Sequence, residues 1–208
     1  MTNFKNGMFL GTILTLLINS VPVSAGVPVL SPATIAKTIG PYPAYGSVGE
    51  ANDDRILMDF QGTRSELDCK TAAAQENGSL KTFFGGPQGP LTDGEVKSLN
   101  SKFLKAHAVA AVNIEIAKRI YKRQRPYNRN QAITPCIPLE TSYSYPSGHT
   151  TMSRLYGRIL SKMYPKRAEA FMKAADAAAQ NRVLGGVHNP SDIEAGKKLG
   201  DKLAAKFF

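Results

Sequence analysis

Apolar side chains recur at intervals of three and four residues along one long stretch of the chain, from Gly94 to about Gln124. This period is that of an α-helix with one buried face, and Thr92-Asp93 supplies side chains that cap helix N-termini. Pro126 is expected to set the end of this helix, because the residue before a proline disfavours helical backbone angles. One face of a long helix should therefore lie against a core formed by the rest of the chain.

Proline and glycine residues divide the remaining sequence into shorter segments. Residues 26–46 and 76–92 are rich in both, so we expect an extended lead-in and a loop there. Further helices are expected over 47–75 (one interrupted at Gly62-Thr63, or two), from Ser147 onward, from Pro165 to Leu184, and from Pro190 onward. The sequence contains no alternating strand pattern of useful length. With 208 residues, the chain is predicted to form a single-domain all-α helical bundle over 26–208.

The first 25 residues differ in composition from the rest of the chain. Lys5 is their only charged side chain, and it precedes an apolar run from Met8 to Leu17. Val23-Ser24-Ala25 then supplies small residues typical of cleavage sites, so residues 1–25 are predicted to be a secretory signal peptide. An uncleaved membrane anchor is the alternative, but the apolar run is shorter than the ~20 residues that cross a bilayer. Export would place the mature protein in the periplasm or outside the cell.

The sequence contains two cysteines, Cys69 and Cys136. An oxidising compartment permits one disulfide between them, with two buried free thiols as the alternative. There is no CxxC motif and no Cys/His cluster, so a structural zinc site is not expected. The formal net charge of +10 is compatible with nucleic acid, an anionic membrane surface or an anionic small substrate, and charge alone does not choose among these partners.

Two stretches carry residues suited to binding an anion. Lys118 and Arg125 are seven residues apart, which on a continuous helix places both cations on nearly the same face. Ser147-Gly148-His149 lies where a turn enters a helix, and the exposed amides of helix N-termini bind phosphate. Each stretch also has a purely structural explanation. Basic residues are favoured near helix C-termini, and Ser147 is a good helix cap.

A third stretch places a cation, an imidazole and a carboxylate in order, at Arg182, His188 and Asp192. A carboxylate four residues after a histidine can accept a hydrogen bond from Nδ1, which leaves Nε2 free to act as a nucleophile. A single His–Asp pair is more often only a structural hydrogen bond. His107, the third histidine, matches no motif and is interpreted as structural.

Together, the three stretches resemble the signature of the type 2 phosphatidic acid phosphatase (PAP2) superfamily, K-x6-RP, then PSGH, then SR-x5-H-x3-D. The corresponding segments here are 118–126, 146–149 and 181–192, in the same order. Their flanking residues and the predicted export signal look most like the bacterial class A non-specific acid phosphatases. The resemblance covers roughly residues 94–206, and it implies the helical core that PAP2 enzymes share with vanadium haloperoxidases. One departure is Asn181, where the family usually has serine.

The resemblance implies an exported, metal-independent acid phosphatase that hydrolyses phosphate monoesters through a phosphohistidine and needs no cofactor. His188 would be the nucleophile, His149 the general acid and then the general base, and Asp192 the group that holds His188. The phosphoryl oxygens would be bound by Lys118, Arg125, Ser147, the Gly148 N–H and Arg182. Mildly acidic conditions should favour activity, and vanadate or inorganic phosphate should inhibit it.

Three other kinds of protein share part of this pattern. Vanadium haloperoxidases are usually longer and have an added histidine in the helix after the Gly-His pair, whereas residues 150–161 contain none. Membrane lipid phosphatases embed the same motifs among spanning helices, and no segment after residue 25 has the required apolar length. A basic nucleic-acid-binding protein would explain the charge but neither PSGH nor the His–Asp pair. We therefore expect small phosphomonoesters as partners, without a specific nucleic acid or an integral membrane; a homo-oligomer is compatible with the sequence.

Overall fold

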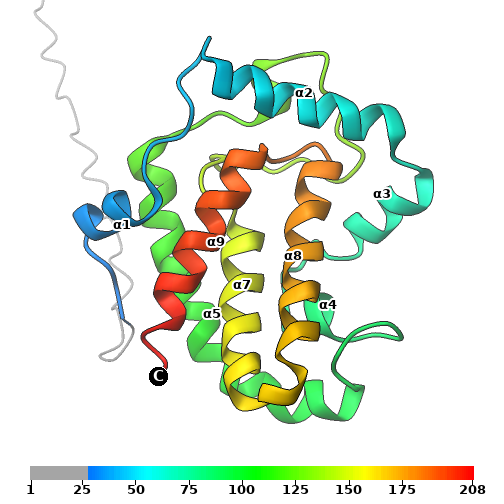
Figure 1. Ribbon diagram of the computed structural model, residues 1–208, viewed down its shortest axis with the longest axis vertical. Helices are drawn as coiled ribbons and strands as arrows, with labels where there is room; N and C mark the ends of the chain where they lie inside the picture. Colours follow the sequence, from blue (N-terminus) through cyan, green and yellow to red (C-terminus); the bar gives the residue numbers. More distant parts are fainter. Residues whose placement is uncertain (1–27) are drawn as a thin grey trace, which may run out of the picture.

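The computed structural model describes residues 28–208, and this part of the chain consists of helices and their connections, without a strand (Figure 1). The predicted all-α fold is confirmed. The predicted signal peptide, residues 1–25, lies outside the described residues. Within 28–208, none of the helices combines the length and the apolar character needed to cross a bilayer.

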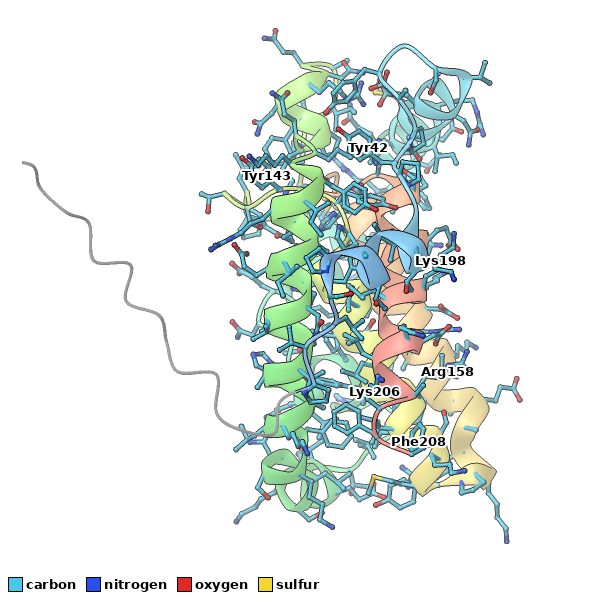
Figure 2. All side chains as sticks on the ribbon, turned by 90° about the vertical axis from the view of Figure 1, so that its left-hand side faces the viewer. Tyr42, Tyr143, Arg158, Lys198, Lys206 and Phe208 are labelled. Atoms are coloured by element: carbon cyan, nitrogen blue, oxygen red, sulfur yellow. A yellow bond between two sulfur atoms is a disulfide. The ribbon has the colours of Figure 1, made fainter. Side chains whose placement is uncertain are left out.

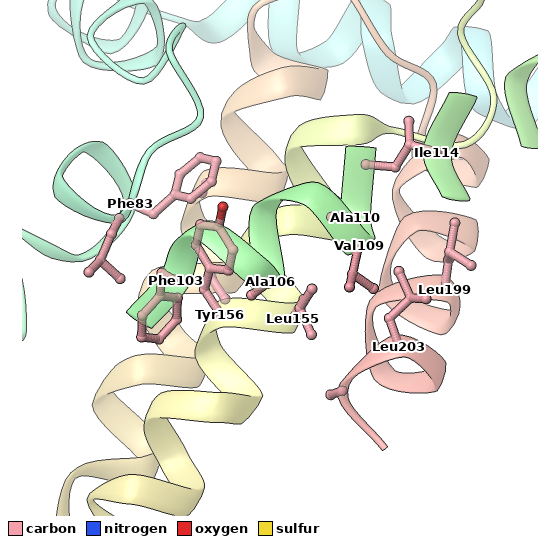
Figure 3. Close-up of a cluster of buried hydrophobic side chains, with 14 of the residues drawn as sticks. Phe83, Phe103, Ala106, Val109, Ala110, Ile114, Leu155, Tyr156, Leu199 and Leu203 are labelled. Carbon is pink, nitrogen blue, oxygen red and sulfur yellow. The ribbon is translucent and has the colours of Figure 1, made fainter. Parts of the chain in front are cut away.

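Four long helices form the body of the molecule (Figure 1). They are α5 (Asp93–Tyr121), α7 (Gly148–Met163), α8 (Ala168–Leu184) and α9 (Pro190–Ala204). Helix α7 packs most extensively against α8 and α9, and α5 packs against α7. Their facing sides bury a continuous apolar cluster that includes Phe103, Val109, Leu155 and Leu199 (Figure 3). A fully buried side chain of this kind stabilises the fold by about 1.5–3 kcal/mol.

Shorter helices surround this body. They are α1 (Pro32–Ile39), α2 (Val48–Thr63), α3 (Glu66–Ala73), α4 (Leu80–Phe84), α6 (Pro126–Arg129) and the 3-10 helix η1 (Pro165–Arg167), which precedes α8. Residues 47–75 therefore form two helices, one of the two predicted alternatives. Helix α2 lies across the end of the bundle where α8 ends and α9 begins (Figure 1).

Two segments predicted to lack helices contain one each. In residues 26–46, Ser31 caps α1, Pro32 occupies its first turn, and Ile35 and Ile39 are buried. Helix α1 lies across α5 and α9, as the turned view in Figure 2 shows. In residues 76–92, α4 buries Leu80, Phe83 and Phe84 behind a serine cap. Both predictions were wrong because a capping serine starts each of these short helices, with proline in the first turn of α1 alone, and burial of apolar side chains then stabilises them.

The end of α5 also differs from the prediction. The helix stops at Tyr121 because Lys122 adopts a left-handed conformation, with φ 48°. Arg125 therefore lies outside α5, immediately before α6, and Pro126 starts α6 instead of setting the end of α5. The inference that Lys118 and Arg125 share one face of a continuous helix was wrong, because the chain changes direction between them.

Two glycines on α9 allow that helix to approach α7 closely. A Cβ atom at Gly196 would lie 2.9 Å from the Ser147 carbonyl oxygen, and one at Gly200 would lie 2.7 Å from Arg154 Cβ. No other residue fits at these distances without a shift of one helix. This contact holds the start of α7, which carries Gly148 and His149, against the helix that carries Asp192.

Cys69 and Cys136 form a disulfide, with their Cα atoms 5.7 Å apart. The bond joins α3 to the connection between α6 and α7, residues 130–147. The Cys136 N–H also donates to the Gly185 carbonyl at 3.1 Å. This connection, which carries several residues of the site described below, is therefore fixed at its middle to two other parts of the fold.

Candidate active site

His188 lies in the turn between α8 and α9 and is completely buried. Gly186 turns the chain there with a φ of 81°, and the His188 N–H donates to the Arg182 carbonyl at 3.3 Å. In the side chain, Nδ1 is 3.3 Å from Asp192 Oδ2, and Nε2 is 2.9 Å from Arg125 Nη1. Because a guanidinium only donates, Nε2 is the acceptor and Nδ1 carries the proton that faces Asp192. The ring is held in one tautomer, with its lone pair on Nε2.

Asp192, in the first turn of α9, is as buried as His188. Its Oδ2 accepts a hydrogen bond from Ser144 Oγ at 2.6 Å, and its Oδ1 accepts one from Arg123 Nη1 at 2.6 Å. Arg123 in turn pairs with Asp53 of α2 at 2.9 Å. Burial alone would raise the pKa of Asp192, but the hydrogen bond with His188 and the charge of Arg123 hold it well below its usual range. Asp192 is therefore a carboxylate that orients His188.

Three buried cations from separate segments meet beside His188. Lys118 Nζ donates to Ser142 Oγ at 3.0 Å, and Arg125 Nη2 donates to the same oxygen at 3.1 Å. Arg182, near the end of α8, shares a carboxylate partner with Arg125, because each donates to one oxygen of Glu140. Burial, followed by the charge of Arg125, lowers the pKa of Lys118 to about 8, so it remains charged in acidic solution. The cluster favours an anion with several oxygens.

Ser147 and Gly148 occupy the start of α7. The Ser147 hydroxyl accepts a hydrogen bond from the Thr150 N–H at 3.3 Å, so in this structure it caps the helix. Its own N–H donates to the Asp192 carbonyl at 3.0 Å. Gly148 and His149 line a cavity of about 320 Å³, together with Asn77, His107, Ala111, Ile114, Glu115, Lys118, Glu140, Ser142 and Met152. His149 is thus next to an open space large enough for a small organic group.

His149 has fewer partners than His188. Its Nε2 is 2.8 Å from the Glu76 carbonyl oxygen, which only accepts, so Nε2 carries the proton. Its Nδ1 is 4.0 Å from Glu140 Oε1, in the direction of the cation cluster. His149 is therefore placed to exchange a proton with a group bound among the arginines or in the cavity.

The two histidines both have depressed pKa values. Burial and the charge of Arg125 lower the pKa of His188 to about 3. Burial and the charge of Arg182 lower the pKa of His149 to about 4, although Glu140 acts in the opposite direction. Both rings are neutral near pH 7 in the free protein, which suits a nucleophile at His188. His149 gains a proton as the pH falls.

The structure therefore brings seven of the eight residues predicted for the site to the cation cluster or to the cavity beside it, whereas the Ser147 hydroxyl is bonded to Thr150. Sequence reasoning missed Glu140, Arg123 and Ser144, which contact predicted residues directly, and Asp53, which pairs with Arg123. None of these four has a local signal that marks it, since each acts through a contact between separate segments of the chain. His107 bonds Tyr156 through Nδ1 at 3.1 Å and lies on the cavity wall, and Asn181 donates to Gln75 at 2.9 Å.

The arrangement suits transfer of a group that carries several anionic oxygens. A neutral imidazole with an oriented lone pair lies beside Arg125, and a second imidazole lies beside a cavity. No cluster of three or more His, Cys, Asp or Glu side chains suited to a metal ion occurs within residues 28–208. The positive charges next to His188 are carried by side chains, and preorganised cations of this kind stabilise negative charge that develops at a reacting centre.

Comparisons with known proteins agree with this geometry. The sequence profile of the PAP2 superfamily matches residues 101–202, which include all of the motif residues. A protein of Salmonella typhi named non-specific acid phosphatase is 38% identical over 89 residues, which cover 40% of this chain and 35% of that protein. A protein of the same name from Providencia stuartii is 27% identical over 177 residues, covering 79% of this chain and 70% of the relative. The chain thus matches about a third of the length of the Salmonella protein.

The fold is also similar to that of a solved bacterial vanadium-dependent iodoperoxidase, with a TM-score of 0.59 and 20% sequence identity. The superposition covers 84% of this chain and 52% of the iodoperoxidase chain. At this identity the likeness concerns the fold alone, and it confirms the predicted helical core. The profile match and the order of the motifs from α5 to α9 show that residues 101–202 are similar to the PAP2 superfamily.

Proposed function

We propose that this protein is an exported, metal-independent acid phosphatase that hydrolyses phosphate monoesters through a phosphohistidine on His188. The observation that carries the proposal is the position of His188 Nε2, which faces Arg125 while Asp192 holds the opposite nitrogen. The names of the Salmonella and Providencia relatives support the reaction class. The disulfide between Cys69 and Cys136 supports export, because such bonds persist in oxidising compartments such as the periplasm.

In the first half of the reaction, Lys118, Arg125 and Arg182 bind the phosphoryl oxygens. Nε2 of His188 attacks phosphorus, and the bond between phosphorus and the ester oxygen breaks. His149, protonated in acid, gives its proton to the leaving oxygen, and the product is an alcohol. The phosphorylated ring of His188 is a cation, which Asp192 stabilises through the Nδ1 proton.

In the second half, a water molecule takes the place of the alcohol. His149, now neutral, accepts a proton from the water as its oxygen attacks phosphorus. The bond between phosphorus and Nε2 breaks, which restores neutral His188 and releases phosphate. The cavity beside His149 supplies room for the leaving group and then for water. Inorganic phosphate and vanadate bind the same cations and therefore inhibit.

A direct test compares the wild type with His188→Ala on a chromogenic phosphomonoester in acidic buffer that contains a chelator. Wild-type activity should survive the chelator, and the variant should lose about 10³-fold or more of kcat, as expected when a nucleophile is removed. An activated aryl phosphate given to His149→Ala should leave phosphate on residue 188, detectable by mass spectrometry after an alkaline quench. Chelator-sensitive activity, or full activity in His188→Ala, would contradict the proposal.

A further inference from the structure

The two arginines of the site hold a carboxylate between them. Glu140 Oε2 is 2.5 Å from Arg125 Nη2, and Glu140 Oε1 is 2.6 Å from Arg182 Nη2. Nδ1 of His149 is 4.0 Å from the same Oε1. Two oxygens of one anion therefore bridge the two guanidinium groups to which the proposed function assigns the phosphoryl oxygens. In this structure, Glu140 occupies the guanidinium groups that the proposed function assigns to the phosphoryl oxygens.

Charge explains why an internal anion sits there. Arg125 and Arg182 are both only 2% exposed, and a buried cation without a partner destabilises a fold strongly. Burial opposes ionisation of Glu140, but its interaction with His188 and the positive charges of Arg125 and Arg182 hold its pKa well below its usual range. Glu140 is thus an anion at acidic pH, and it neutralises the arginines until another anion takes its place.

The side chain of Glu140 can leave without movement of its backbone. The Glu140 N–H donates to Tyr127 Oη at 3.1 Å, and the Tyr127 hydroxyl donates to the Glu140 carbonyl at 2.7 Å. The backbone is thereby fixed on both sides of the residue. The side chain is 25% exposed and borders the cavity beside His149, so rotation about its own bonds moves the carboxylate from the arginines into open space.

A second contact couples this residue to the nucleophile. Arg125 uses Nη2 for Glu140 and Nη1 for Nε2 of His188. The backbone carbonyls of Val187 and Ser142 also hold this guanidinium, each at 2.8 Å, through Nη1 and Nε respectively. Arg125 therefore keeps its place beside Nε2 when Glu140 leaves, and its Nη2 becomes available to a phosphoryl oxygen next to the lone pair that would attack phosphorus.

We propose that Glu140 is an internal competitor for the phosphoryl site. Its carboxylate binds Arg125 and Arg182 in the free protein, and the phosphoryl group of a monoester, or inorganic phosphate, displaces it into the adjacent cavity. This inference rests on the proposed function for the identity of the displacing anion. A monoester carries up to two negative charges on its phosphoryl group and a diester only one, so the competition favours monoesters over diesters.

The test is the affinity of the full-length folded protein for inorganic phosphate, measured by calorimetry without turnover. Glu140→Gln keeps the shape of the side chain and removes its charge. In the wild type, only the minor fraction of molecules in which Glu140 has left the arginines can bind phosphate. Because apparent affinity scales with that fraction, Glu140→Gln should bind phosphate about tenfold more tightly than the wild type. The matched control is Glu115→Gln, which removes an equal charge from the wall of the same cavity, where Glu115 pairs with Arg119 and not with the site arginines. Its phosphate affinity should stay within about twofold of wild type.

Equal or weaker phosphate binding by folded Glu140→Gln would overturn the inference, and so would equal gains in both variants. Should Glu140→Gln fail to fold, Glu140→Asp keeps the charge but is too short to bridge both arginines, and it should bind phosphate more tightly than wild type. Weaker binding by that variant overturns the inference as well. Because the readout is binding, a protein that binds phosphate as predicted but hydrolyses no monoester would refute only the proposed function.

Discussion

The surroundings of His188 and His149 differ although both rings lie near the same arginines. His188 is completely buried, and Asp192 behind it is fixed by Ser144 and Arg123. His149 has one close hydrogen bond, to a backbone carbonyl, and lies against a cavity. The nucleophile proposed at His188 must keep one tautomer and one direction of attack, which a dense polar network supplies. The acid proposed at His149 must exchange protons with solvent and face leaving groups of different shape, which the open wall permits.

The largest effect should come from breaking the network behind the nucleophile. Asp192→Asn replaces the acceptor of the Nδ1 proton by an amide that can present its donor group, and the preferred tautomer of His188 is lost. We expect kcat to fall by about 10³–10⁴-fold, as when the carboxylate of a catalytic histidine is neutralised in other enzymes. Steady-state kinetics on a chromogenic phosphomonoester measures this loss.

The control for that experiment is Asp53→Asn, which removes a carboxylate from the other side of Arg123. Both variants leave a buried guanidinium with one partner fewer, so both should lower the free energy of unfolding by a few kcal/mol, roughly 3 at most, and denaturant titration measures this. Only Asp192→Asn should also disable His188. Similar kinetic losses in the two variants would mean that the network serves folding alone.

A smaller effect is expected at the open side. His149→Ala should lower kcat for an alkyl phosphate by about 10²–10³-fold, because its leaving oxygen needs a proton. With p-nitrophenyl phosphate, whose leaving group is a weak base, His149→Ala should slow the first step of the reaction much less. Added imidazole should restore part of the activity of His149→Ala through the cavity, but none in His188→Ala, where the ring is enclosed. Rescue of both variants, or of neither, would contradict the claim that His149 faces an open cavity while His188 is enclosed.

The last prediction concerns pH and separates the two rings by their pKa values. As the pH falls from 7 toward about 4, the protonated fraction of His149 grows, so kcat/KM should rise by up to about tenfold per pH unit. It should fall again below about pH 3, where His188 gains a proton and loses its nucleophilic lone pair. The measurement is a kcat/KM profile from about pH 2 to about pH 8 for the wild type and His149→Ala. A maximum above neutrality, or an unchanged acid rise in the variant, would contradict these assignments.

Much of the fold was predictable because its information is local. The helical period along α5 and the Pro and Gly residues that bound α8 and α9 can be recognised from short stretches of the sequence. Helices α1 and α4 were missed because their prolines, glycines and capping serines are equally typical of loops. Their burial against distant helices, which a single stretch does not reveal, decides between the two structures.

The site divides in the same way. The motif residues were predicted from their order along the chain, although Lys118 and Arg125 meet by a turn at Lys122 and not by helical spacing. Glu140 and Arg123 were missed because they act through tertiary contacts, with Arg182 and Asp192 respectively. A charge that neutralises another charge across the fold leaves no pattern in either segment.

Gly196 and Gly200 have a consequence for how such a site can change. The spacing between the helices that carry His149 and Asp192 is set where α9 meets α7, at two glycines whose missing side chains allow close contact with Ser147 and Arg154. Cavity-wall positions such as Ala111 and Met152 can accept new side chains and admit new alcohols while that contact stays as it is. Substitutions in the cavity wall can therefore change which alcohols the site admits. The geometry of the reacting groups stays fixed, because no methyl group fits at either glycine.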